Sequence, residues 1–244
     1  CGVVEALGPG VEGLAVGRRV AAVLAHGGFA ERAVAAAAAC VPVPDAMPDA
    51  EAAVLQVAHG TSHVALARRA RLRPGERLLV LGAGGGVGLT AVEIGALMGA
   101  EVVAAASGPE KREAARAKGA AHVVDADPET LRDAVRALGG ADVVYDPVGG
   151  DLWKAALRAA NFEARLLPIG FASGAVPQIP ANILLVKNLD VIGLYWGAYR
   201  RHAPEVLAES LRRLLGWWGE GRLRPRVAER LPLARANEAL AMLE

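Results

Sequence analysis

The chain has 244 residues and a net charge of +1; 53% of the residues are hydrophobic and 22% are charged. These proportions are typical of a globular protein with one large domain or two smaller ones, and they exclude a disordered chain. The small net charge gives no support for binding to nucleic acid or to a membrane surface.

The first part of the chain alternates short apolar runs with glycine and proline, which predicts a small β-rich domain. Strands are expected at three places, residues 3–4, 20–24 and 33–34. Asp49 is a plausible N-cap for a helix over residues 50–57, and Thr61 is expected to open a second helix. The β-rich part is expected to end near residue 60.

From Pro74 onward the pattern changes to apolar runs that alternate with segments of helical period. Strands are expected over residues 78–81, 101–107, 122–126, 141–149 and 164–171, and a last apolar run covers 189–197. Helices are expected over residues 89–98, 109–120, 128–140, 151–161 and 204–225. Alternation of this kind predicts βαβ units and therefore a doubly wound α/β fold around a parallel sheet.

A glycine-rich loop separates the first of these strands from the first helix. Its best register against the dinucleotide fingerprint G-x-G-x-x-G is Ala83, Gly84, Gly85, Gly86, Val87 and Gly88, with alanine at the first position. In that register Gly85 lets the backbone approach a pyrophosphate, and Gly88 lets the helix pack closely on the strand. The pattern predicts dinucleotide binding, and the alternative is a tight strand–helix turn without a ligand.

The end of the second strand indicates which dinucleotide is preferred. An acidic residue there would hold the adenosine ribose hydroxyls of NAD, but the position falls at Ala106. Ser107 can donate a hydrogen bond nearby, and Lys111 can contribute a cation. We therefore expect NADP(H), and the alternative for Lys111 is an ordinary solvated residue of a helix.

The cysteine content and the hydropathy of the chain indicate its cellular location. Cys1 and Cys40 lie outside any C-x-x-C motif and are too few for a disulfide framework. No apolar run reaches the length of about 18 residues that a membrane-spanning helix needs, and no signal peptide opens the chain. A reducing, cytoplasmic location is expected.

Several motifs occur in an order that resembles the zinc-free quinone oxidoreductase (ζ-crystallin-like) branch of the medium-chain dehydrogenase/reductase superfamily. They are GVVEALGPGVEGLAVGRRVAA, GGFAERAV, AHGTSHVAL, LGAGGGVG, DPVGG, LLPIGFASG and IPANILLVKNLDVIGLYWGAY. The resemblance covers essentially the whole chain. It implies a partial GroES-like catalytic domain over residues 1–60, a Rossmann domain over 61–202 and a C-terminal segment over 203–244 that returns toward the catalytic domain.

The resemblance also implies that parts of the family's pattern have no counterpart here. Roughly the first 60 residues of the family's N-terminal part and its final strand are not matched by this sequence. The unmatched part includes a wall of the nicotinamide site, so this chain is expected to be inactive by itself. No catalytic residue is identified in it.

The family's cofactor contacts carry over by resemblance to twelve positions: Thr61, Ala83, Gly85, Gly86, Val87, Gly88, Ser107, Lys111, Val148, Ile169, Gly170 and Phe171. Thr61 would lie near the nicotinamide ribose or phosphate, Val148 at the end of a strand, and residues 169–171 beside the nicotinamide. Relatives often have a tyrosine after the third strand, where this sequence has Ala126. That difference leaves Lys111 with more of the 2′-phosphate contact.

No metal is expected. By resemblance, the downstream zinc cysteine falls near Ala53, and the four-cysteine structural lobe is absent. His26, His59 and His63 are not at ligand spacing with any cysteine, and all three are expected to be surface or cap residues.

The resemblance implies an NADPH-dependent enzyme that reduces quinones or activated alkenes (enones) by hydride transfer. Tyr195, Trp196 and Tyr199 are candidates for a pocket or an interface, and the run near residues 191–195 is expected to be an edge strand that pairs two subunits of a homodimer. Alternatives are a zinc alcohol dehydrogenase, an enoyl-thioester reductase, and an NADPH-binding structural protein without turnover. A small-molecule acceptor is the expected partner.

Overall fold

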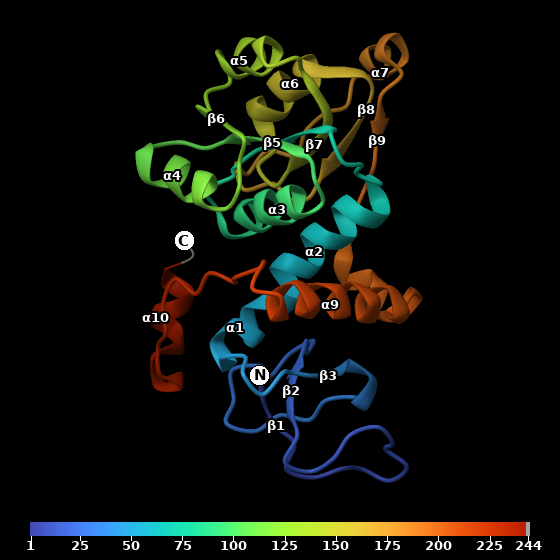
Figure 1. Cartoon of the computed structure of the whole chain (residues 1–244), viewed down its shortest axis with the longest axis vertical. Coiled ribbons are helices and arrows are strands. Elements are labelled where there is room, and N and C mark those ends of the chain that lie inside the picture. Colours follow the sequence, from blue (N-terminus) through green and yellow to red (C-terminus); the bar gives the residue numbers. More distant parts are fainter. Residues whose placement is uncertain (243–244) are drawn as a thin grey trace. The chain divides into compact units, whose positions relative to one another are not determined.

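The computed structural model describes residues 1–242 and divides the chain into two compact units. One unit comprises Ala58–Ser210, and the other comprises Cys1–Val57 together with the chain from Leu211 onward. The sequence analysis placed its boundaries near residues 60 and 202, beside these two divisions. Each unit has a sheet of its own (Figure 1).

The larger unit is built on a six-stranded parallel sheet in the order β6-β5-β4-β7-β8-β9. Its strands are β4 (Arg77–Val80), β5 (Glu101–Ala105), β6 (His122–Val124), β7 (Ala141–Asp146), β8 (Ala160–Pro168) and β9 (Asp190–Val191). Leu78, Leu79 and Val80 have no exposed surface, because a parallel sheet is covered on both faces. The expected parallel sheet and doubly wound α/β fold are confirmed.

Helices cover both faces of this sheet, with α5 and α6 on one face and α3 on the other (Figure 1). The helices of the unit are α3 (Gly86–Leu97), α4 (Pro109–Ala117), α5 (Leu131–Ala137), α6 (Gly150–Ala159), α7 (Ala181–Lys187) and the short α8 (Tyr199–His202), which follows the 3-10 turn η4 (Trp196–Ala198). The sequence analysis did not expect α7. The core on the α5/α6 side is formed around Trp153, which is completely buried against sheet residues such as Val144 and Leu166.

A continuous helical stretch runs from Asp49 to Arg69. It consists of α1 (Asp49–Val54), the π-helical segment η2 (Leu55–His59), α2 (Gly60–His63) and a second π-helical segment, η3 (Val64–Arg69). Two expectations are therefore wrong: Thr61 does not begin a new helix, and Pro48 rather than Asp49 is the N-cap. The Asp49 carboxylate instead accepts a hydrogen bond from the Arg19 guanidinium.

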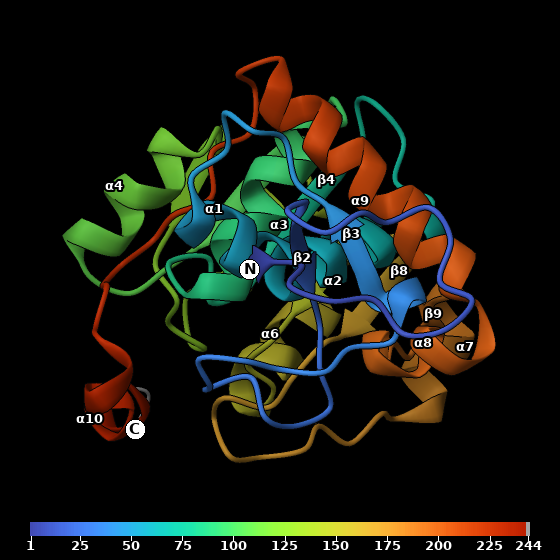
Figure 2. The same ribbon diagram turned by 90° about the horizontal axis from the view of Figure 1, so that it is seen from below.

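The smaller unit contains an antiparallel sheet in the order β1-β2-β3, formed by β1 (Gly2–Val3), β2 (Arg19–Ala22) and β3 (Cys40–Pro42). The segment between β2 and β3 runs as loops outside the sheet (Figure 2), apart from the 3-10 turn η1 (Ala37–Ala39). The strand expected at residues 33–34 is wrong. Val34 is 99% exposed, because this alanine-rich stretch offers little apolar surface to bury.

The C-terminal part contributes α9 (Pro204–Gly219), the 3-10 turn η5 (Leu233–Arg235) and α10 (Ala236–Ala241). The division between the units after Ser210 falls inside α9. Within the smaller unit the indole of Trp218 donates a 2.7 Å hydrogen bond to the carboxylate of Glu51. Among the helices that the structure describes, none combines the length and hydropathy that crossing a bilayer requires.

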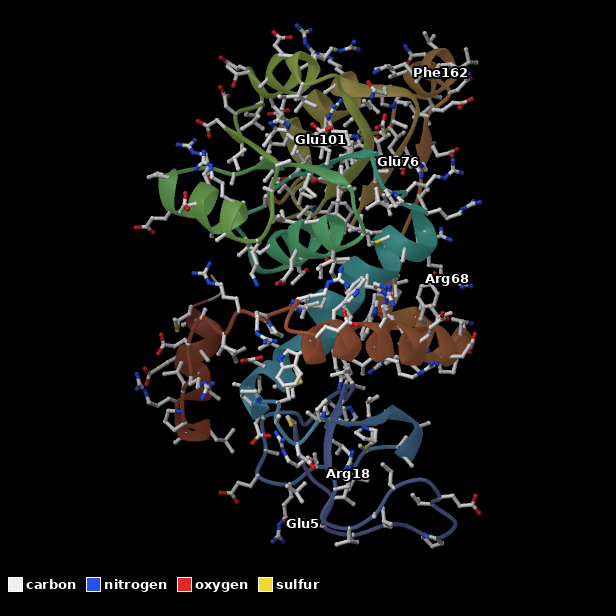
Figure 3. All side chains as sticks on the ribbon, viewed as in Figure 1. Glu5, Arg18, Arg68, Glu76, Glu101 and Phe162 are labelled. Carbon is white, nitrogen blue, oxygen red and sulfur yellow. The ribbon has the colours of Figure 1, made fainter. Side chains whose placement is uncertain are left out.

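Ion pairs connect the amino ends of the parallel strands, near the labelled side chains Glu76 and Glu101 in Figure 3. Glu101 on β5 accepts from Arg77 on β4 and contacts His122 on β6, each at 2.8 Å. The hydrogen bond from Arg77, together with that from His122, lowers the pKa of Glu101. At the opposite edge of the sheet, the carboxyl ends of the strands continue into loops.

Candidate functional site

The candidate site is at the carboxyl ends of β5, β4, β7 and β8. Strand β4 is the first strand of the six-stranded sheet along the chain, and its neighbours are β5 on one side and β7 on the other. The strand order therefore reverses at β4. In open α/β sheets ligands bind at such a switch point, outside the carboxyl ends of the strands.

The glycine-rich loop turns directly from β4 into α3. The amide of Gly85 donates to the carbonyl of Gly82 at 2.9 Å, and the amide of Leu89 donates to the carbonyl of Gly85 at 2.8 Å. A Cβ atom on Gly88 would lie 2.2 Å from the carbonyl oxygen of Gly82, so the helix approaches the loop more closely than any side chain allows. The predicted role of Gly88 in close packing is confirmed.

The first turn of α3 is suited to an anion. The first N–H groups of a helix have no intrahelical partner, and they give this end a partial positive charge. Gly85 and Gly86 are exposed, so this end of the helix is open to solvent. A pyrophosphate could approach the backbone here, because neither glycine carries a side chain.

Lys111 lies across this loop. A Cβ on Gly84 would be 2.4 Å from Cβ of Lys111 and 2.7 Å from its Cγ, so the alkyl stem of the lysine covers the α-carbon of Gly84. The contact brings the alkyl stem of the lysine from α4 to the glycine-rich loop. It also explains Gly84, which the fingerprint leaves unassigned.

The loops after β7 and β8 are joined through Asp146. One carboxylate oxygen, Oδ1, accepts the amides of Val148 at 2.7 Å and Gly149 at 2.9 Å. The backbone carbonyl of Asp146 accepts the amides of Ile169 at 2.7 Å and Gly170 at 3.3 Å. Asp146 thus holds three of the expected cofactor residues in one assembly. Strand β7 ends at Asp146, so Val148 lies in the turn after the strand and not at its end.

Asp146 is also electrostatically unusual. Its side chain is completely buried, and its second oxygen, Oδ2, has no hydrogen-bond partner in the described structure. Burial raises the pKa of Asp146, and the two amide hydrogen bonds oppose this shift only in part.

Side-chain packing connects the same loops. A Cβ on Gly82 would lie 2.7 Å from the Cγ2 methyl of Val148, and one on Gly149 would lie 3.5 Å from the ring of Phe171. The glycine-rich loop, the β7 loop and the β8 loop therefore contact one another directly, with glycine α-carbons at the contact points.

A buried hydroxyl network joins α2 to α3 and β7. The hydroxyl of Ser62 is 2.7 Å from the hydroxyl of Thr90 and 2.8 Å from that of Tyr145. Thr90 also donates to the carbonyl of Val87, in the first turn of α3, at 2.8 Å. Burial raises the pKa of Tyr145, which keeps its phenol protonated. The network holds the helix that carries Thr61 against the start of α3.

One histidine was interpreted wrongly. His59 is 3% exposed rather than a surface or cap residue, because it lies inside the continuous helical stretch and faces Glu93 of α3. Its Nε2 lies 3.5 Å from Oε2 of Glu93, and the ammonium of Lys118 lies 2.9 Å from the other oxygen of the same carboxylate. His26 is exposed, as expected, and His63 is half-buried with Nδ1 2.9 Å from the hydroxyl of Ser210.

The remaining candidates lie further from these loops or have fewer contacts. Ser107 is exposed immediately after β5. Tyr195 is 79% exposed, whereas the indole of Trp196 covers Gly60, whose Cβ would lie 3.1 Å from Nε1. Within residues 1–242, no group of three or more histidine, cysteine, aspartate or glutamate side chains could hold a metal ion.

Away from these loops, helices α5, α6 and α7 form an open groove of about 450 Å³. It is lined by Arg132, Asp133, Arg136, Arg158, Ile183 and Lys187. Its cations have a structural role. The ammonium of Lys187 donates to the carbonyls of Leu157, Arg158 and Ala160 at the end of α6, and Arg136 donates to the carbonyl of Arg158. Cations at a helix C-terminus satisfy its last carbonyls, so we assign no ligand to this groove.

Several residues of the site were not singled out as candidates from the sequence, among them Ser62, Gly84 and Asp146. Asp146 carried a signal, since aspartate followed by Pro-Val-Gly-Gly favours a turn in which the carboxylate accepts backbone amides two residues on. Gly84 and Ser62 carried none, because their roles arise from Lys111 and Tyr145, which are distant in the chain.

Comparisons with known proteins agree with this geometry. Residues 86–213 match the family model described as zinc-binding dehydrogenase. A quinone oxidoreductase-like protein 2 homolog of Nematostella vectensis is 38% identical over 248 residues, covering 99% of this chain and 68% of the relative. The quinone oxidoreductase of Thermus thermophilus, solved also as its NADPH complex, is 34% identical with a TM-score of 0.82, over 93% of this chain and 72% of that one. The Escherichia coli quinone oxidoreductase complexed with NADPH is 28% identical with a TM-score of 0.89, over 99% and 76%.

Proposed function

Because the chain belongs to the zinc-binding dehydrogenase family, in the quinone oxidoreductase branch of the medium-chain dehydrogenase/reductase superfamily, we propose that it is an NADPH-dependent oxidoreductase that reduces quinones or activated alkenes. Two similar solved structures hold NADPH, which supports this choice of cofactor. The partner is then a small-molecule acceptor, with no role for nucleic acid or a membrane.

The observation that carries the proposal is the close approach of Gly88 to Gly82. The 2.2 Å separation between a Cβ on Gly88 and the carbonyl of Gly82 requires glycine at 88, and the exposed glycines at 85 and 86 present a backbone surface at the start of α3. A dinucleotide pyrophosphate needs such a surface, since its oxygens accept hydrogen bonds from backbone N–H groups at close range. The residues present therefore fit the cofactor.

The charges beside this loop support a 2′-phosphorylated cofactor. No acidic residue stands at the end of β5, where Ala106 and Ser107 follow the strand. Lys111, whose stem lies on Gly84, carries a positive charge to the same region. A cation in this place favours NADPH, whereas a carboxylate would favour NADH.

In the proposed reaction, this chain mainly binds the cofactor and orients it toward the acceptor. When bound, the nicotinamide would supply the hydride, and a quinone or an enone would accept it and then take a proton from water or a side chain. Residues 169–171, which Asp146 holds in place, would lie beside the nicotinamide ring. We propose that the reaction needs no zinc, in agreement with alanine at position 53.

We also propose a homodimer formed through β9. This strand is at the edge of the sheet, and the neighbouring side chains Leu185, Val186 and Tyr195 are 77%, 74% and 79% exposed. Light scattering would report twice the chain mass, and a monomer at all concentrations would contradict the proposal. Both cysteines are free thiols, which is compatible with a cytoplasmic location.

Calorimetric titration with NADPH and with NADH tests the cofactor. Tighter binding of NADPH, lost in Lys111→Ala but kept in Lys154→Ala, is the expected result. Lys154 is a suitable control because it is an exposed lysine paired only with Asp151 on α6. Oxidation of NADPH over a panel of quinones and enones then tests the acceptor. Because this chain is expected to be inactive by itself, the acceptor panel requires a protein that also carries the family's N-terminal part, and binding without turnover in that protein would favour a non-catalytic NADPH-binding protein.

A further inference from the structure

The ends of β5 and β6 lie side by side next to the candidate site. Ala105 pairs with Val124 in the parallel ladder, and the amide of Ala106 donates to the carbonyl of Val124 at 3.2 Å. The residues that follow are Ser107 on one strand and Asp125 on the other. A carboxylate is therefore close to the position where the adenosine ribose of a dinucleotide would lie.

Two consecutive cations of α4 contact different neighbours of this position. The stem of Lys111 lies on Gly84 in the glycine-rich loop. The guanidinium of Arg112 reaches the other side, where Nη1 is 3.2 Å from Oδ2 of Asp125. Successive residues of an α-helix are rotated by about 100°, so the first turn of α4 can place the two charges on separate sides.

The ion pair with Asp125 orients Arg112 without using all its hydrogen-bonding capacity. A guanidinium has five N–H donors, and in the described part of the chain Asp125 is the one side chain paired with it. The Arg112 side chain is 29% exposed, so its remaining donors can be reached from solvent. A guanidinium held in this way can bind a phosphate through two parallel hydrogen bonds.

The ion pair between Arg112 and Asp125 also changes the net charge of this position. Alone, the Asp125 carboxylate would repel a 2′-phosphate and would favour a cofactor with a free 2′-hydroxyl. Paired with Arg112, its charge is compensated, and Lys111 remains as the net positive charge of the position.

We propose that Arg112 is a second specificity-determining residue for the 2′-phosphate, and that Asp125 is the positioning residue that holds it. The inference rests on the proposed function, because it requires an NADPH site. It goes beyond the role of Lys111, because it assigns a second contact with the 2′-phosphate, on the β6 side, to Arg112. Without Arg112, the carboxylate of Asp125 would favour NADH.

Calorimetric titration of the full chain with NADPH, NADH and 2′,5′-ADP tests this. Arg112→Ala should weaken NADPH and 2′,5′-ADP binding by about tenfold to hundredfold, because a charge-assisted hydrogen bond is lost and Asp125 is left uncompensated. NADH binding should change by less than about threefold. Arg116→Ala is the matched control, since this arginine of α4 is paired with Glu113 on the exposed side.

The double variant Arg112→Ala/Asp125→Asn identifies the role of Asp125. Removing the carboxylate should restore part of the affinity for NADPH that Arg112→Ala loses. Equal weakening of NADPH and NADH by Arg112→Ala, or no weakening of either, would overturn the proposal for Arg112. No recovery in the double variant would overturn the role of Asp125. If the unmodified chain binds neither dinucleotide, the proposed function itself fails and this inference fails with it.

Discussion

Replacing Gly88 by alanine is the most direct perturbation of the candidate site. The added Cβ would be 2.2 Å from the carbonyl oxygen of Gly82, 2.8 Å from its carbonyl carbon and 2.9 Å from Cα of Ala83. All three are backbone atoms, so no side chain can rotate away. The loop or the helix must move by roughly 1 Å before these atoms reach ordinary van der Waals separation.

Overpacking of this kind costs about 1–3 kcal/mol, and more where the backbone cannot adjust. With a urea dependence of about 2 kcal/mol per molar, the unfolding midpoint of the α/β unit should fall by roughly 0.5–1.5 M. Far-UV circular dichroism reports the transition, and tryptophan fluorescence, to which the completely buried Trp153 contributes, provides a second probe. Affinity for NADPH should fall as well, because the shift moves the N–H groups that would face the pyrophosphate.

Gly86→Ala is the matched control. Gly86 lies two residues earlier in the same turn of α3 and has no atom within 4 Å of its Cβ position. Alanine there should leave the free energy of unfolding unchanged or raise it by up to about 1 kcal/mol, because alanine favours the helix. If Gly88→Ala is as stable as Gly86→Ala and binds NADPH equally well, the argument from close packing is refuted.

Three further predictions concern buried groups and metal. Asp146→Asn keeps an acceptor for the amides of Val148 and Gly149 but removes a buried charge whose pKa is raised in the folded state, so it should gain stability over the unmodified chain at neutral pH. The gain should vanish as the pH falls through the folded-state pKa, and a gain that persists in acid would contradict this cause. Tyr145→Phe removes the phenol that meets Ser62 and should cost about 1 kcal/mol of unfolding free energy in urea titrations, and no loss would show that the network is not stabilising. Metal analysis of the purified protein should find no stoichiometric zinc, and stoichiometric zinc would favour the alcohol dehydrogenase alternative.

The strands of the larger unit could be predicted because each is a short apolar run that both faces of the sheet bury. Leu78–Val80 within β4 is an example, since its identity as a strand follows from local composition and length. The strand expected at 33–34 shows the limit. Val34 has the side chain of a strand residue, but no neighbouring segment offers it a ladder or an apolar face.

The candidate site likewise contains residues that the local sequence predicts and residues whose environment depends on distant parts of the chain. Gly88 follows from a local fingerprint, and the structure explains it through one backbone contact. His59 could not be interpreted from its neighbours, because its burial depends on Glu93, which belongs to another helix. The start of a helix at Thr61 was wrongly predicted for a related reason: the helix continues through Gly60, on which the distant indole of Trp196 packs.

The contact between Lys111 and Gly84 has a consequence for anyone who redesigns this protein to use the cheaper cofactor NADH. Substituting Lys111 alone would remove a charge and also expose the glycine α-carbon that its stem covers. Gly84 has no left-handed backbone angle, but an added Cβ would lie 2.4 Å from Cβ of Lys111, an atom that every residue except glycine has. Shortening the side chain at 111 therefore does not make room for alanine at 84, and Gly84 should be kept in a library that varies Lys111.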